Sequence, residues 1–117
     1  MHEQYAKLLS LVAHTSANIA EQTMDKNKEE GKLQEYSNAK KMRDNFLDIK
    51  QKLDEKQTLE NGDFANLYIA TGLVAQQIEA RARRDEMVVK SYREDIMPKL
   101  LKCSQGENSE EIFSVNI

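Results

Sequence analysis

The side chains best suited to bind a charged ligand are clustered at positions 76–86, in the sequence QQIEARARRDE. Arginine guanidinium groups bind phosphate through paired hydrogen bonds, so this cluster could mark a nucleic-acid or phosphate site. The segment balances its three arginines with three acids: Arg81, Arg83 and Arg84 stand beside Glu79, Asp85 and Glu86. Because these charges sum to zero and the whole chain carries a net charge of −3, we do not expect nucleic acid as the main partner.

No other combination of side chains matches a metal, cofactor or catalytic motif. His2 and His14 are far apart, and neither is followed by a histidine, cysteine or acid at the third or fourth position. Cys103 is the single cysteine, which excludes an internal disulfide and a cysteine-based zinc site. The four glycines are isolated, so no loop has the pattern that cradles phosphate. We therefore expect a protein that is not an enzyme and needs neither metal nor cofactor.

The composition predicts an all-α protein of one domain. At 117 residues the chain has the length of a single domain. Hydrophobic residues make up 39% and charged residues 32%, a balance typical of amphipathic helices with narrow apolar stripes. Four glycines and one proline leave little material for the turns of a β-rich fold.

The chain has the features of an intracellular protein. No apolar run approaches the roughly 20 residues that span a membrane, so we expect no membrane insertion. The first residues, MHEQYAKLLSLVAH, lack the basic start of a signal peptide. A lone cysteine agrees with a reducing compartment. The expected location is the cytoplasm, or the nucleus if the source is eukaryotic.

Hydrophobic periodicity predicts an elongated antiparallel three-helix bundle over residues 1–103, with helices at about 3–28, 33–60 and 64–97. Gly31 is expected to end the first helix. A tight turn at Asn61-Gly62-Asp63, with Asp63 as the cap, should return the third helix against the second as a coiled-coil-like hairpin. The seam of the second helix has spacings of three and four: Ala39, Met42, Phe46, Ile49 and Leu53.

The third predicted helix would be roughly 50 Å long and would end before Pro98, unless a kink carries it through Leu100 and Leu101. Arg81 and Asp85 fall on its apolar stripe, four residues apart. Two interpretations remain: both side chains reach water, or they form a polar layer that sets the register of a partner helix. The apolar stripe outruns its partners in the chain, so we expect a partner interface at Arg81, Asp85, Val88, Val89, Tyr92 and Ile96.

Residues 104–117 are expected to form a flexible tail. Polar, acidic residues QGENSEE precede an apolar ending, IFSVNI. The apolar positions Ile112, Phe113, Val115 and Ile117 could be a linear motif that adds to a sheet edge or fills a groove, or they could fold back loosely. On the motif hypothesis, removal of residues 105–117 should weaken partner binding while leaving stability nearly unchanged.

These patterns favour a non-catalytic helical interaction subunit, either self-associated through the third helix or assembled with another protein. The alternative is a small adaptor or inhibitor that binds and masks a target protein. A helical nucleic-acid-binding protein is the third hypothesis.

Overall fold

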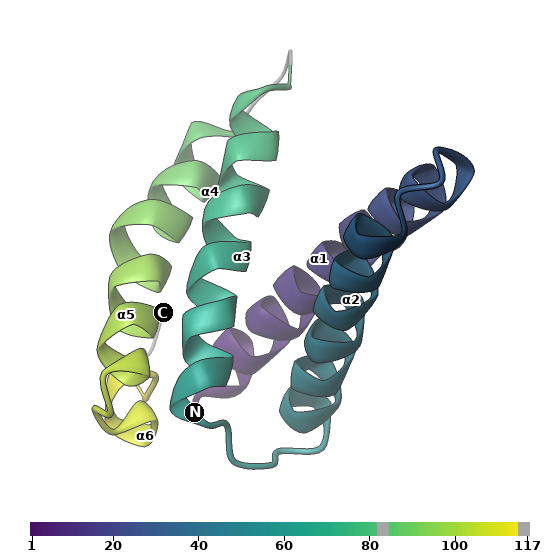
Figure 1. Cartoon of the computed structure of the whole chain (residues 1–117). Coiled ribbons are helices and arrows are strands. Elements are labelled where there is room, and N and C mark those ends of the chain that lie inside the picture. Colours follow the sequence, from purple (N-terminus) through teal and green to yellow (C-terminus); the bar gives the residue numbers. More distant parts are fainter. Residues whose placement is uncertain (82–84, 115–117) are drawn as a thin grey trace.

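The computed structural model describes residues 1–81 and 85–114, and this part of the chain is entirely helical, as predicted. Its elements are α1 (Glu3–Glu29), α2 (Leu33–Asp54), α3 (Asn61–Glu79), α4 (Glu86–Ser91), the π-helix η1 (Tyr92–Ile96), α5 (Met97–Ser104) and α6 (Ser109–Ile112). Figure 1 shows two helical hairpins that share a base and diverge from it. One hairpin is α1 with α2, and the other is α3 with the continuous helix formed by α4, η1 and α5.

The first hairpin is held together by small side chains on α1. Ala13, Ala17 and Ala20 are all buried, and they recur at the three- and four-residue spacing of one helix face. Gly31 takes the left-handed conformation (φ +71°) and ends α1, which confirms that prediction. The Lys32 N–H donates to the Asn27 carbonyl and the Gly31 N–H to the Lys28 carbonyl, the pattern of a Schellman motif.

The second helix ends six residues earlier than the predicted position 60. It stops at Asp54, where Lys56 takes the left-handed conformation (φ 59°) that glycine usually provides. Helix α3 then begins at Asn61, so Asn61 and Gly62 are its first residues and do not form the predicted turn. Asp63 lies one turn inside the helix, and its carboxylate accepts a hydrogen bond from the backbone N–H of Glu60. The sequence analysis therefore placed this cap and turn incorrectly.

The prediction of one long helix from 64 to 97 is wrong. Helix α3 ends at Glu79, and a new helix begins at Glu86 with Asp85 as its N-cap. The chain reverses direction between them, so α4, η1 and α5 pack beside α3 (Figure 1). The two halves have apolar stripes of the same phase, and each stripe is buried by folding back onto the other half. Arg83 and Arg84 lie outside the described residues.

The helix after the reversal does not end before Pro98 but runs through it to Ser104. Proline has no N–H to continue an α-helix, and its ring clashes with the carbonyl four residues earlier. The preceding turn is widened into a π-helix, in which the Met97 N–H donates to the Tyr92 carbonyl. This widening leaves room for the ring, and it brings Tyr92, Ile96 and Leu100 to the buried side.

One core joins both hairpins and the segment that follows α5. Its fully buried side chains come from every long helix and from beyond α6: Leu9, Val12, Ile49, Leu67, Ile96, Leu100 and Phe113. Phe113 is 0% exposed and meets the ring of Tyr5 edge to face, with ring centroids 5.1 Å apart. Its carbonyl accepts a hydrogen bond from the His2 N–H, so the described part of the expected flexible tail is packed against α1.

Candidate interaction surface

The described residues contain no cluster of side chains suited to acid–base, nucleophilic or metal chemistry. Within residues 1–81 and 85–114, no group of three histidine, cysteine or acidic side chains is arranged to hold a metal ion. Cys103 is buried, and burial raises the pKa of its thiol to about 11, which keeps it in the unreactive protonated form. No helix in the described ranges has both the length and the apolar character needed to cross a membrane.

The largest recess is an open groove of about 830 Å³ at the base of the molecule. It is lined by the start of α1, the α2–α3 loop and the α5–α6 loop. Acids on its rim have cations of the same chain as partners: Glu3 pairs with Lys7, and Asp54 pairs with Lys50 and accepts a hydrogen bond from Ser10. These charges hold neighbouring elements together, and they do not converge on a ligand.

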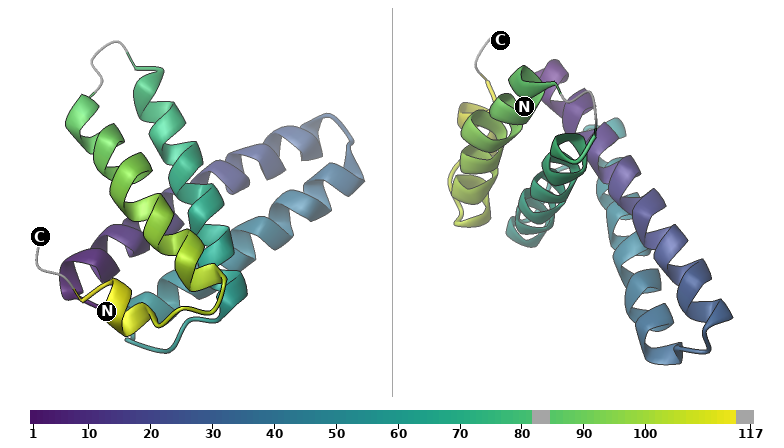
Figure 2. Two further views of the ribbon diagram at one scale, coloured as in Figure 1. Left: turned by 90° about the vertical axis from the view of Figure 1, so that its left-hand side faces the viewer. Right: turned by 90° about the horizontal axis from the view of Figure 1, so that it is seen from above.

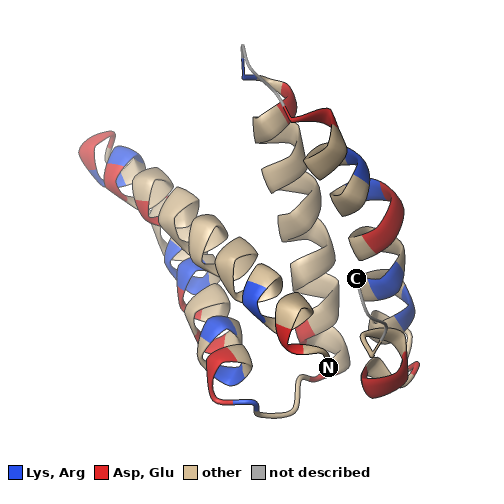
Figure 3. Ribbon diagram, turned by 180° about the vertical axis from the view of Figure 1, so that it is seen from behind, with Lys and Arg blue, Asp and Glu red and all other residues tan. Residues whose placement is uncertain are grey.

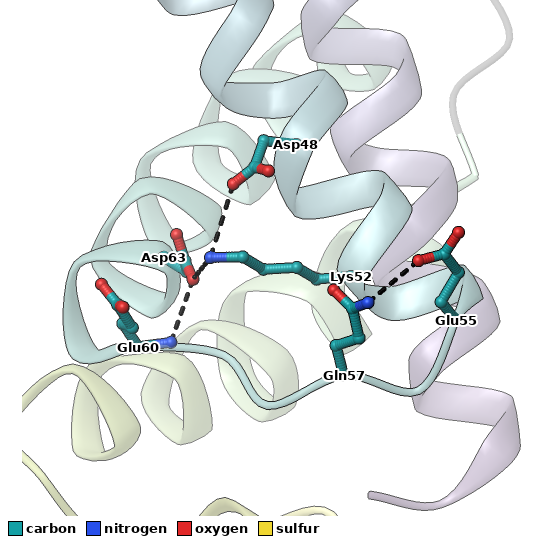
Figure 4. A network of polar contacts seen from close by, with 6 residues as sticks. All are labelled: Asp48, Lys52, Glu55, Gln57, Glu60 and Asp63. Atoms are coloured by element: carbon teal, nitrogen blue, oxygen red, sulfur yellow. Dashed lines mark hydrogen bonds and ion pairs between the residues drawn. The ribbon is translucent and has the colours of Figure 1, made fainter.

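A polar network at the same base fixes how α2 meets α3 (Figure 4). The Lys52 ammonium lies 3.0 Å from one carboxylate oxygen of Asp63 and 3.4 Å from one of Asp48. The same Asp63 oxygen accepts the N–H of Glu60 at 2.9 Å. The hydrogen bond to Asp63 raises the pKa of Lys52, because it favours the charged ammonium. Lys52 therefore faces α3, which identifies the side of α2 that is turned toward the second hairpin.

From this joint the facing sides of α2 and α3 can be followed along both helices. On α2, Ile49 is one turn from Lys52 on the same side and is buried. On α3, the stripe that starts at Asp63 passes through the fully buried Ala70. Farther from the base both stripes become exposed, because the two hairpins diverge (Figures 1 and 2). We call the exposed continuation the wedge surface; it consists of Asn38, Met42 and Asn45 on α2 with Leu73 and Gln77 on α3.

The wedge surface carries no charge, although 32% of the chain's residues are charged. Met42 is 49% exposed and Leu73 43% exposed, and their stripe neighbours are amides. Elsewhere on α2 the exposed positions are mostly ionic, as at Lys40, Lys41, Asp44 and Asp48. Helix α3 has no charged residue between Asp63 and Glu79, and Figure 3 shows its ribbon uncoloured over that length. A helix face intended only for water is usually charged, so these stripes have the character of contact surfaces.

The structure separates the residues of the predicted interface. Tyr92 and Ile96 are buried inside the chain, and Val88 and Val89 are half-buried. They belong to the packed second hairpin, and the surface left over for them in a single long helix does not exist.

Arg81 and Asp85 do not share a helix. Arg81 is exposed beyond the end of α3, whereas Asp85 caps α4 by accepting hydrogen bonds from the N–H groups of Met87 and Val88. The helical-wheel argument that paired the two residues therefore no longer applies.

The predicted tail motif is also divided. Ile112 is half-buried and Phe113 is fully buried, so neither projects freely from the chain. Val115 and Ile117 lie outside the described residues.

Sequence analysis missed most of the wedge surface. Met42 was predicted to lie on the helix seam, but Leu73, Gln77, Asn38 and Asn45 were not singled out. The signal that could have found Leu73 and Gln77 is the uncharged run from Phe64 to Ile78 in a highly charged chain. Neither protein-family models, curated proteins nor solved structures yield a match to this chain.

Proposed function

We propose that this protein is a non-catalytic helical interaction subunit that binds another protein through the wedge surface. The observation that carries the proposal is the exposed, uncharged stripe on each of two diverging helices, beginning where their mutual contact ends. Burying Met42 and Leu73 removes apolar surface from water, and the neighbouring amides can hydrogen-bond without the cost of desolvating a charge.

The chemistry of the wedge surface indicates what kind of partner fits. A charged side chain docked against Met42 or Leu73 would lose its hydration without gaining an opposite charge. An amphipathic helix with apolar and amide side chains at three- and four-residue spacing matches both stripes. We therefore propose a helical protein partner rather than nucleic acid.

The test compares partner recovery by three forms of the full chain, tagged and expressed in the source cells. In the first, Met42→Glu and Leu73→Glu place charges on both walls of the wedge surface. In the second, Leu47→Glu adds a charge at an outward position of α2 that is 44% exposed, closely matched to Leu73. The third is the unaltered protein.

We expect proteins recovered with the unaltered chain and with Leu47→Glu to be lost from the double variant, as measured by quantitative mass spectrometry. Circular dichroism should show equal helix content in all three forms, since the changed positions are exposed. An identical set of recovered proteins for the double variant and the control would overturn the proposal.

A further inference from the structure

We infer that the occupant of the wedge surface is a second copy of this chain, in a two-fold symmetric dimer whose diverging hairpins interlock. The inference deepens the proposed function and rests on it, because it takes the wedge surface to be an interface. The two walls come from the two arms of one chain, α2 and α3. A second copy therefore presents the same pair of walls, and a two-fold axis lets each copy occupy the opening of the other.

Charge favours this occupant at this position. Each chain has 20 acidic and 17 basic residues, so two copies repel one another weakly at long range. At short range the repulsion depends on which side chains meet. The wedge stripes contain only Asn38, Met42, Asn45, Leu73 and Gln77, so apposing them brings no like charges together. The rest of α2 would set lysines and acids against their own copies.

The side chains are also suited to one another. Leu73 of one chain can pack on Met42 of the other, and methionine adapts its shape to such a contact. Asn38, Asn45 and Gln77 each carry both donors and acceptors, so amides can pair across the axis. A buried asparagine at a helix interface selects one register and one number of chains. The same composition that admits a second copy therefore also restricts how it binds.

The size of the wedge surface indicates a reversible dimer. Five side chains per copy form a patch smaller than the roughly 800 Å² per partner of a standard stable interface, unless adjoining positions contribute. We therefore expect a dissociation constant on the order of micromolar and a rapid exchange between monomer and dimer. Dimer content should rise with protein concentration.

The experiment is light scattering of the purified full chain up to about 1 mM, well above a micromolar dissociation constant. The expected mass rises from the 13.5 kDa of one chain toward twice that value. Leu73→Glu should hold the mass at that of the monomer, because it opposes a charge to an apolar side chain in both halves of the interface. Leu47→Glu should dimerise like the unaltered chain. Gln77→Arg, at an exposed amide, provides a second disruptive variant if Leu73→Glu unfolds.

A monomer at all concentrations, or a dimer that survives both wedge variants, would overturn the inference. Either result leaves the proposed function to its own test, because loss of a foreign partner from the Met42→Glu, Leu73→Glu chain is measured separately. A monomer with a wedge-dependent foreign partner would refute self-association and keep the interaction role. A wedge-dependent dimer would support both.

Discussion

At the scale of single residues, the clearest departure from local preference is Lys56. Its left-handed backbone (φ 59°) ends α2, and the Gln57 N–H donates to the Lys52 carbonyl across it. A side chain in this conformation costs about 1–2 kcal/mol because its Cβ crowds the following carbonyl oxygen. Gly31, in the corresponding place after α1, avoids that cost.

We therefore expect Lys56→Gly to stabilise the protein by about 1 kcal/mol in urea unfolding, even after the greater entropy of glycine in the unfolded chain is counted. The matched change Gly31→Lys should destabilise it by a similar amount. Gln57→Gly, one position on, has no left-handed backbone to relieve and should be neutral or slightly destabilising. No gain from Lys56→Gly would show that this helix end relaxes at little cost.

The second residue-scale prediction concerns acid stability and Asp54. A hydrogen bond from Lys50, and after it one from Ser10, lowers the pKa of Asp54 below its ordinary value of 3.8. Because the folded-state pKa is the lower one, the stabilisation is present above pH 3.8 and is lost as the pH falls through the folded value.

Asp54→Asn should therefore be less stable than the parent at neutral pH. The difference between them should shrink as the pH falls below 3.8. Urea unfolding at several pH values measures both quantities. Asp25→Asn, which alters an exposed acid near the end of α1, serves as the control. A difference that is constant with pH would contradict the linkage.

At the scale of elements, α6 and the residues after it complete the core rather than extend from it. Asn108 caps this short helix by accepting the Glu110 N–H, and Phe113 then enters the core beside Tyr5. The hydroxyl of Tyr5 also donates to Asp95 at 3.1 Å and accepts from the Lys99 ammonium at 2.6 Å. The start of α1 is thus joined to both η1 and the segment after α5.

Phe113→Ala should cost about 3–5 kcal/mol of unfolding free energy, the usual range for removing a fully buried phenylalanine. Deleting residues 105–117 should destabilise at least as much, which reverses the small effect that the flexible-tail hypothesis predicts. Ser114→Ala, at the exposed neighbouring position, should change stability by less than about 0.5 kcal/mol. If Phe113→Ala matched this control, the ring would not belong to the core.

At the scale of the whole molecule, the angle between the hairpins depends on few polar contacts at the base. Lys52 bridges α2 to Asp63 of α3, and both helices diverge beyond it (Figure 4). Since the wedge surface exists only because the arms diverge, this joint also sets the width of the opening.

Lys52→Met should remove the bridge and leave Asp48 and Asp63 without their shared cation. We expect the radius of gyration in solution to rise relative to the parent, whose Cα value is 14.8 Å, while helix content stays the same. Small-angle scattering and circular dichroism measure the two. Lys50→Met removes an ion pair within α2 and should leave the radius unchanged. An unchanged radius for Lys52→Met would show that apolar packing alone sets the angle.

The sequence by itself determined the helical character of the chain and several of its local features. The three- and four-residue spacing of Phe46, Ile49 and Leu53 correctly predicted a buried seam on α2, and Gly31 correctly predicted the end of α1. These features depend on neighbours within one or two helical turns, which the sequence shows directly.

Only the tertiary structure decided which apolar stripe is covered and by what. Tyr92 and Ile96 have the same stripe pattern whether the chain continues straight or folds back, so periodicity could not distinguish an exposed interface from a packed hairpin. Met42 and Ile49 lie on one side of α2, yet only Ile49 is covered, because α3 diverges before it reaches Met42. A helical wheel gives the direction of a side chain around its own axis, whereas burial depends on where the other helices pass.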